Sequence, residues 1–287
     1  MRKEISSKCI LKTAPENLYG RTNHPKEDFG LITVQIETPL YVWMELLTHK
    51  RPSRNASSNR AMPPQINLNL GYFMPKNFHY KSKGMQSGEI VSEEIQKLAE
   101  IGWIEVWEFC KTKMLEFDSW GIAKEESSRL LPTFKIMNGL VTATKDAWDC
   151  LLDLRTAKNA DKAMQELANK IKKSIKEKEW NYSYFHQPFL LDDEKSLSDS
   201  GFLAAGRIAR LSYGDIKNKD GDIELGKRLL QDGHFSCFEH SAEWVEEPLL
   251  SNLSSKPDDK YSDEYGYNYG WQNLRSELEE TLDKNID

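Results

Sequence analysis

Helical periodicity runs through most of residues 92–180, and this long segment limits the folds open to the chain. Ser92 followed by two Glu residues is typical of a helix start. Apolar side chains then recur every three or four residues to about Gly121, and a second helix is expected from Lys124 to Pro132. Two more amphipathic helices follow, the first ending at Arg155. Together with the strands described next, this pattern predicts an α+β fold.

Strand patterns lie on both sides of the helical segment. Ile32, Val34 and Ile36 alternate at period two, which predicts a half-buried strand that ends at Pro39 and leads into a helix. Residues 1–28 show no periodicity and are interpreted as a loop-rich lead-in. Later in the chain we expect a strand over Ile208–Tyr213 and a helix over Ile223–Leu230.

The length of 287 residues is close to the upper limit for one hydrophobic core, so we expect one domain over residues 1–250, an antiparallel or mixed sheet with packed helices. Residues 251–287 are rich in acidic, Ser, Asn and Tyr residues and are interpreted as an acidic tail, mobile or used to dock a partner.

Charge and cysteine content narrow the possible functions. A net charge of −6 argues against an extended nucleic-acid surface, although one small anion could bind in a local pocket. No apolar run reaches the roughly 20 residues that span a bilayer, so we expect no membrane function and a cytoplasmic protein. The four cysteines form no CxxC pair, which predicts reduced thiols and no cysteine-rich metal site.

Two short segments carry candidate chemistry. The segment from Thr48 to Arg60 holds basic side chains, a histidine and several hydroxyls after a predicted helix, which is a composition that can hold phosphate, although polar loops of this kind are usually only loops. In Gly233–His240 two histidines flank Cys237; this segment could contribute to a zinc site, but no fourth ligand is evident nearby, and the histidines could equally hydrogen-bond turns. Arg155, at the end of an apolar helix, needs an anionic partner if it is buried.

Taken together, these segments resemble the flavin-dependent thymidylate synthases. Gln35–Lys50 lines up without gaps with the family's strand, helix and signature histidine, which falls at His49. The stretch from Pro132 to Arg155 matches the family's segment from an LP motif to a helix ending in LR. Ala209–Gly214 and Gly233–His240 are similar to elements that normally open the chain, so the resemblance implies a thymidylate-synthase-like fold with permuted connectivity.

The resemblance also implies roles for individual residues. Arg155 and Ser58 would be catalytic, with Arg155 holding the pyrimidine ring. Residues implied in substrate binding are Ser53, Asn55, Ser58, Arg60, Arg129, Glu45 and Arg155. Residues implied in flavin binding are His49, Lys50, Thr144, Asn159, Ser212, His234, Ser236 and Glu239. No metal is implied.

Several positions depart from the family pattern. Thr48 replaces an arginine that touches flavin, and Glu45 replaces a glutamine near the phosphate, where a carboxylate repels the nucleotide unless it is paired. Ala56 replaces a glutamate of the signature loop, and Asp146 and Asn159 stand where the family often has basic residues. Arg129 lies one position nearer the LP motif than the family's phosphate-binding arginine. The contacts with phosphate and flavin are therefore expected to be rearranged.

The resemblance implies FAD-dependent transfer of a one-carbon unit from methylenetetrahydrofolate to C5 of dUMP, with NADPH as reductant and sites shared between subunits of a homotetramer. Two alternatives stay open. One is hydroxymethylation or another C5 modification of dUMP or dCMP, and the other is a non-catalytic homologue that binds a nucleotide or a protein partner.

Overall fold

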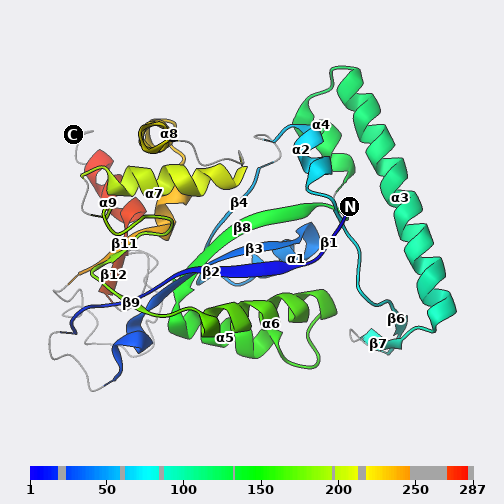
Figure 1. The fold of residues 1–287 in the computed structure, drawn as a ribbon, viewed down its shortest axis with the longest axis horizontal. Coiled ribbons are helices and arrows are strands. Elements are labelled where there is room, and N and C mark those ends of the chain that lie inside the picture. Colours follow the sequence, from blue (N-terminus) through cyan, green and yellow to red (C-terminus); the bar gives the residue numbers. More distant parts are fainter. Residues whose placement is uncertain are drawn as a thin grey trace.

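A computed structural model describes residues 1–18, 24–58, 62–83, 87–131, 133–195, 198–212, 218–245 and 270–283. Within these residues the protein is an α+β fold in which a central mixed sheet lies between two layers of helices (Figure 1). A third group of elements, dominated by one long helix, extends from one end of the sheet (Figure 1).

The central sheet has five strands within the described residues, in the order β4–β8–β3–β2–β9. Their bounds are Ser53–Ala56, Ile136–Thr144, Leu31–Pro39, Ser6–Ala14 and Asn181–Tyr182. The pairs β2–β3, β3–β8 and β4–β8 are antiparallel, whereas β9 joins β2 in parallel, so the sheet is mixed. The alternating residues of β3 confirm the predicted strand, because Ile32, Val34 and Ile36 all lie in one buried cluster.

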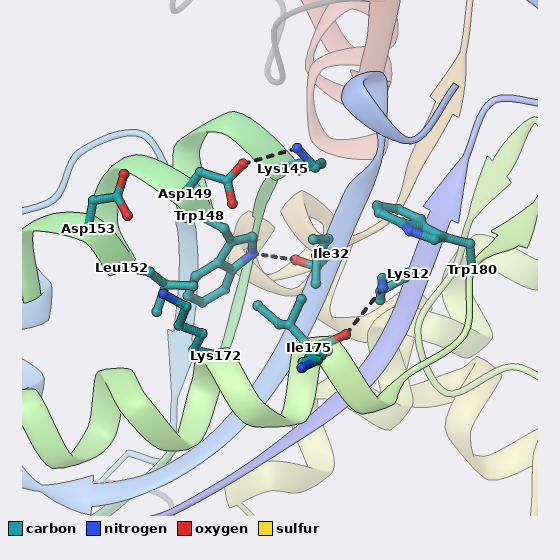
Figure 2. A pocket seen from close by; sticks show the side chains of 11 residues that line it. Lys12, Ile32, Lys145, Trp148, Asp149, Leu152, Asp153, Lys172, Ile175 and Trp180 are labelled. Atoms are coloured by element: carbon teal, nitrogen blue, oxygen red, sulfur yellow. Dashed lines mark hydrogen bonds and ion pairs between the residues drawn. The ribbon is translucent and has the colours of Figure 1, made fainter. Parts of the chain in front are cut away.

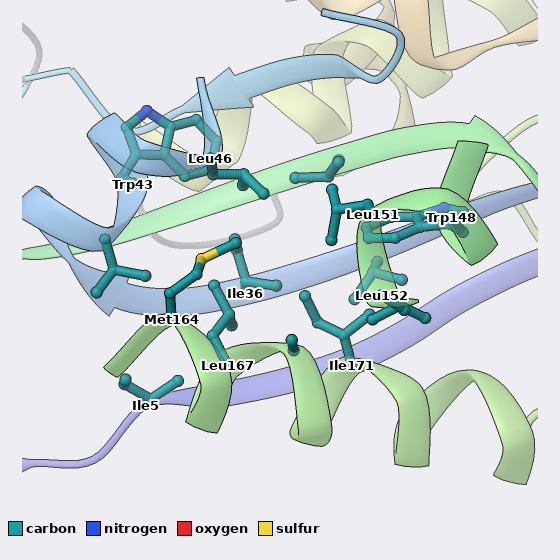
Figure 3. Packing of buried hydrophobic residues seen from close by; sticks show 14 of the residues in the cluster. Ile5, Ile36, Trp43, Leu46, Trp148, Leu151, Leu152, Met164, Leu167 and Ile171 are labelled. Atoms are coloured by element: carbon teal, nitrogen blue, oxygen red, sulfur yellow. The ribbon is translucent and has the colours of Figure 1, made fainter. Parts of the chain in front are cut away.

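Helices α1 (Leu40–Leu46), α5 (Lys145–Arg155) and α6 (Lys162–Glu177) cover one face of the sheet (Figure 3). Asp161 begins α6 by accepting hydrogen bonds from the amides of Ala163 and Met164, both at 3.0 Å. The ring of Trp43 from α1 lies directly over Gly139 of β8, where a Cβ would come within 2.3 Å of the indole. Glycine at this strand position therefore lets α1 approach the sheet closely.

The opposite face carries a second core. It is formed by α7 (Ser200–Ala209), α8 (Lys219–Gln231), α9 (Leu274–Asp283) and the 3-10 helix η4 (Phe235–His240). A three-stranded sheet borders this layer, with strands β10 (Phe185–His186), β11 (Ala242–Trp244) and β12 (Trp271–Asn273). Both faces of the central sheet are thus buried.

Most of the remaining elements lie at the end of the sheet where α3 (Glu93–Ser119) stands. Ser92 begins α3, as predicted, by accepting a hydrogen bond from the amide of Ile95 at 3.4 Å. The neighbouring helices are α2 (Pro64–Asn69), α4 (Lys124–Ser127) and the 3-10 helix η2 (Ser128–Leu130). Two short strand pairs also lie in the described residues: β1 (Arg2–Lys3) with β5 (Tyr72–Phe73), and β6 (His79–Lys81) with β7 (Ser87–Ile90). The last described elements are the 3-10 helices η1 (Lys26–Phe29) and η3 (Arg210–Ser212).

Three expectations are corrected by the structure. The supposed lead-in contains β2, and the sequence analysis also missed β8, which lies at the centre of the sheet. The segment expected as a strand over Ile208–Tyr213 is helical as far as it is described, because α7 continues to Ala209 and η3 follows. Residues 270–283, which we assigned to the tail, instead form β12 and α9, and Trp271 is buried.

Candidate functional site

Arg155, at the C-terminal end of α5, joins a small polar cluster with residues at the end of α1. Its Nε donates to Nε2 of His49 at 2.8 Å, and one terminal nitrogen donates to Oγ1 of Thr48 at 3.3 Å. The other terminal nitrogen forms an ion pair with Glu45. The structure therefore brings together three predicted site residues, and Glu45 has the cationic partner that a carboxylate near a phosphate site would need.

The hydrogen bonds of this cluster fix the state of His49. Burial, followed by the nearby charges of Arg155 and Arg54, lowers the pKa of His49, so the ring is neutral near pH 7. Because Nε2 accepts a hydrogen bond from Arg155, the ring proton must reside on Nδ1. Arg155 uses three of its five N–H groups within the described residues and keeps two for a ligand.

A second group of predicted residues lines a cavity beyond the other end of β4, which we call the Ser58 cavity. Its volume is about 210 Å³. The lining residues are Leu40, Ser57, Ser58, Glu125, Arg129, Lys135 and Met137. Ser58 and Arg129, both expected to bind phosphate, thus share one cavity, although Arg129 is itself exposed.

Lys135 is the residue of the Ser58 cavity that the sequence analysis missed. Its side chain is only 6% exposed, and burial lowers its pKa to about 8. Within the described part of the chain no carboxylate forms an ion pair with Lys135. Glu125, the acidic residue of the cavity, forms no ion pair there either. A buried ammonium group in this setting favours an anionic ligand, which would offset its loss of hydration. The available sequence signal was a single lysine between Phe134 and Ile136 in an apolar stretch.

The strand β4 separates these two groups and contacts the layer on the far face of the sheet. Asn55 donates from Nδ2 to the sulfur of Cys237 in η4 at 3.3 Å. Burial raises the pKa of the Cys237 thiol to about 11, so this cysteine stays protonated and is not a nucleophile near neutral pH. Ser53, at the start of β4, pairs in register with Thr142 of β8 and is half-buried.

The other predicted residues are dispersed, and they belong neither to the Arg155 cluster nor to the Ser58 cavity. Glu239 forms an ion pair with Arg275 of α9, which the sequence analysis did not single out. Thr144 is buried and donates to Asp146 at 2.5 Å. Burial raises the pKa of Asp146, but hydrogen bonds from Arg51 and Thr144 outweigh this effect and lower it. The predicted flavin contacts that lie exposed on the surface are Lys50, Asn159, His234 and Ser236.

Two predicted residues cannot be placed. Arg60 and the side chain of Ser212 lie outside the described residues. The Ser58 cavity does not include Arg155, which instead belongs to the cluster with His49 and Glu45. The expectation that site residues meet across subunits of a homotetramer stays a prediction.

Another cavity, also of about 210 Å³, opens between α5, α6 and the sheet (Figure 2). Its exposed walls are largely apolar, with Trp148, Leu152 and Trp180 prominent. Of its charged side chains, Lys145 and Asp149 hydrogen-bond each other at 3.1 Å. Lys12 donates to the carbonyl oxygens of Ile175 at 3.2 Å and Lys178 at 2.9 Å. None of the predicted site residues lines this cavity.

In the described segments, no group of three or more His, Cys, Asp or Glu side chains is arranged to hold a metal ion. No helix of those segments is both long enough and apolar enough to cross a membrane.

Comparison with known proteins shows a likeness in fold. No family model matches the chain, and no curated protein matches it in sequence. The structure is similar to that of the UMP/dUMP methylase PolB from Streptomyces cacaoi bound with 5-Br UMP, with a TM-score of 0.53 and 13% identity over 61% of this chain and 90% of that one. The complex of PolB with 5-Br dUMP gives a TM-score of 0.50 and 14% identity over 61% and 91% of the two chains.

These comparisons correct the family assignment made from the sequence. The chain was expected to match the flavin-dependent thymidylate synthases, whereas no family model matches and the structural likeness is with a UMP/dUMP methylase. The resemblance rested on short, widely separated motifs, and positions such as Thr48, Glu45 and Ala56 depart from them. The permuted order and the flavin contacts were inferred from that family, so they lose its support. What holds is an α+β fold with mixed sheets similar to that of PolB.

Proposed function

We propose that this chain binds a pyrimidine nucleoside monophosphate and modifies carbon 5 of its base. The observation that carries the proposal is the Ser58 cavity, where Lys135 is buried without a carboxylate partner in the described residues, beside Arg129 and two serine hydroxyls. The likeness in fold to a UMP/dUMP methylase supports a pyrimidine nucleotide as the anion. A methyltransferase-like enzyme is the class that agrees with both observations.

The chemistry of the Ser58 cavity suits a phosphate group. Lys135 and Arg129 would supply positive charge, and charged donors form the stronger hydrogen bonds to phosphate oxygens. Ser57 accepts a bond from the amide of Asn138 at 3.4 Å, which leaves its O–H as a donor toward the cavity. A bound phosphate would also raise the pKa of Lys135 again, because it restores a counter-charge to the buried ammonium group.

Arg155 is the candidate for recognition of the base. Its two remaining N–H groups match the carbonyl oxygens of a pyrimidine, and a guanidinium stabilises negative charge that develops on the ring during chemistry at C5 or C6. Glu45 offsets part of the charge of Arg155. That ion pair favours a second candidate function, in which the nucleotide is bound without being turned over.

The binding step is tested by replacing Lys135. We expect Lys135→Gln to weaken dUMP binding by about 10- to 100-fold, the range of a hydrogen bond to a charged group. Lys124→Gln, a change at a neighbouring lysine that does not line the cavity, should leave the affinity unchanged. Calorimetry with dUMP and with deoxyuridine separates phosphate recognition from base recognition, because deoxyuridine should bind both variants equally. Equal dUMP affinity in Lys135→Gln and in the wild type would contradict the phosphate site.

The chemical step is tested by release of tritium from C5-labelled dUMP, UMP and dCMP. Release identifies the base that is modified, and mass analysis of the product distinguishes a methyl from a hydroxymethyl group. Binding without release from any of the three nucleotides would favour the non-catalytic alternative. FAD, NADPH and methylenetetrahydrofolate stay predictions, and the visible absorbance of the purified protein with added FAD tests the first of them directly.

A further inference from the structure

The long helix α3 has two apolar faces, of which only one packs against other residues that the structure describes. On its inner face Trp107 and Met114 are buried, and Trp103 donates its indole N–H to the carbonyl oxygen of Phe73 at 2.9 Å. Trp107 also stands edge-on to the ring of Phe134, with 5.6 Å between ring centroids. This face anchors the helix and accounts for its position at the end of the sheet.

The opposite face of α3 carries an exposed row of large apolar side chains, which we call the outer stripe. Its members are Ile95, Leu98, Ile101, Val106 and Phe109, each between 42% and 64% exposed. At 3.6 residues per turn they fall within an arc of about 140° around the helix. Glu94 and Glu105, both exposed, fall within the same arc, so the stripe is interrupted by two carboxylates. An exposed apolar row of this size marks an interaction site more often than a solvated face.

Gly102 lies in the middle of the outer stripe. A methyl group added there would meet no atom of the described residues within 4 Å, so no contact within this chain requires a glycine. Glycine inside a helix costs about 0.5–1 kcal/mol relative to alanine, and its advantage is that another backbone can come close. The stripe is therefore built for close approach at its centre.

The charges beside the outer stripe indicate which helix would approach. Lys97 lies beside one edge of the stripe before Gly102, and Glu108 lies beside the same edge after it, where it also forms an ion pair with Lys111 at 3.0 Å. A second α3, antiparallel about a two-fold axis at Gly102, would place Lys97 of each copy opposite Glu108 of the other. In a parallel pair this edge of one helix would face the opposite edge of its partner, and the two charges would no longer lie opposite each other. The apolar residues agree, since Leu98 would meet Val106.

We propose that the outer stripe is the interface with a second copy of this chain, paired antiparallel through α3 around a two-fold axis close to Gly102. The surface is self-complementary, which is the property that an isologous two-fold contact requires. This inference goes beyond the proposed function, since it depends on no ligand. It also supplies one of the contacts from which a larger symmetrical assembly can be built.

The first test measures mass in solution by analytical ultracentrifugation. We expect the wild-type chain to sediment at twice its mass of 33.2 kDa, or at a higher even multiple, and Leu98→Glu to lose the α3 contact, which halves that mass. Leu191→Glu is the matched control, because Leu191 is 65% exposed and Leu98 is 62% exposed, but it lies far from α3 in the chain. A monomeric wild type would overturn the proposal, as would a Leu98→Glu variant with unchanged mass.

The second test determines the orientation of the pair by disulfide trapping, in a background with Cys110 and Cys150 replaced by serine. Gly102→Cys should cross-link to its own copy, because the axis brings these positions together. Glu105→Cys should not, since its two copies would be offset by about 9 Å along the helices, beyond the roughly 7 Å limit for a disulfide. Cross-linking of both variants would indicate a parallel pair, and cross-linking of neither would place the contact elsewhere; either result contradicts the proposed pairing.

Discussion

Buried hydroxyls and imidazoles form a continuous hydrogen-bonded chain through the centre of the protein. Oγ1 of Thr33 lies 2.6 Å from Oγ1 of Thr142 and 2.7 Å from Nε2 of His186. Thr142 in turn lies 2.8 Å from Nδ1 of His240, and His186 lies 2.9 Å from Thr13. The Nε2 atom of His240 has no partner among the described residues. A proton there would be buried without an acceptor, so we infer that Nδ1 carries it and donates to Thr142.

Both histidines make the stability of the fold depend on pH. Burial lowers the pKa of His186 and of His240 to about 3, whereas an unfolded histidine takes up a proton near 6.5. As pH falls below about 6.5 the unfolded state binds more protons, so the free energy of unfolding decreases. From about pH 7.5 to about pH 5.5 we expect a loss of about 1.4 kcal/mol for each histidine.

Urea unfolding at those two pH values measures this loss. His240→Gln should reduce the pH dependence by about half, and His234→Gln, at an exposed histidine, should leave it unchanged. A free energy of unfolding that does not change over this range would show that the two buried rings are not held neutral.

Single residues also show what the sequence could and could not reveal about the candidate site. Glu45 was predicted to need a partner, and the structure supplies Arg155, because both residues lie at the ends of helices that begin where adjacent strands end. Lys135 was missed, because no local pattern distinguishes a buried lysine from an exposed one. Lys135 becomes a candidate site residue because it shares a cavity with Ser57 and Ser58, which lie more than seventy residues away in the chain.

Among the elements, those with a strong period were predicted and those with mixed patterns were not. The helices α3, α5, α6 and α8 and the strand β3 show clear apolar periodicity. The strand β2 lies within residues 1–28, which show no apolar periodicity and were therefore interpreted as loop-rich. Lys12 is nevertheless buried, because its ammonium group donates to two carbonyl oxygens near the end of α6 and lies 4.4 Å from the ring centroid of Trp180. A tertiary contact therefore outweighs the local signal.

The crossing of α7 and α8 depends on two glycines at which backbones nearly touch. A Cβ at Gly226 would come within 2.2 Å of the carbonyl oxygen of Phe202, and a Cβ at Gly206 within 1.9 Å of that of Asp222. Neither oxygen can move without shifting a helix, so we expect Gly226→Ala to lower the free energy of unfolding by about 1–3 kcal/mol through overpacking. Thermal or urea unfolding measures the change.

Gly201→Ala is the control for this prediction. The three atoms nearest to its new methyl group all belong to the side chain of Leu274, and the closest, Cδ2 at 2.5 Å, lies at the end of a side chain that can rotate away. We expect an effect smaller than that of Gly226→Ala. If both substitutions destabilise equally, the cause is the general cost of replacing glycine in α7 and α8, and the close crossing is not responsible.

At the scale of the whole molecule, the sequence indicates the class of fold but not which distant strands pair with one another. The central sheet combines a strand from the first fifteen residues with strands near residues 55 and 140, and the smaller sheet joins residues near 185, 243 and 272. Local periodicity does not contain these pairings, because each depends on segments that are distant in the sequence. The composition of the C-terminal region suggested a tail because its apolar residues are few. Those that are described, such as Trp271, pack against residues that are distant in the sequence.

The packing of residues 270–283 against the rest of the described fold leads to a prediction about the free energy of unfolding. Trp271 is only 1% exposed, donates its indole N–H to the carbonyl oxygen of Phe29 at 2.6 Å, and stands edge-on to Trp244 with 5.4 Å between centroids. We expect Trp271→Ala to lower the free energy of unfolding by about 3–5 kcal/mol, the range for removing a large buried aromatic side chain. Trp120→Ala, at a tryptophan that is 66% exposed, should change it by less than about 0.5 kcal/mol. Urea unfolding followed by circular dichroism measures both, and equal stability of the two variants would mean that residues 270–283 are a dispensable appendage and not part of the core.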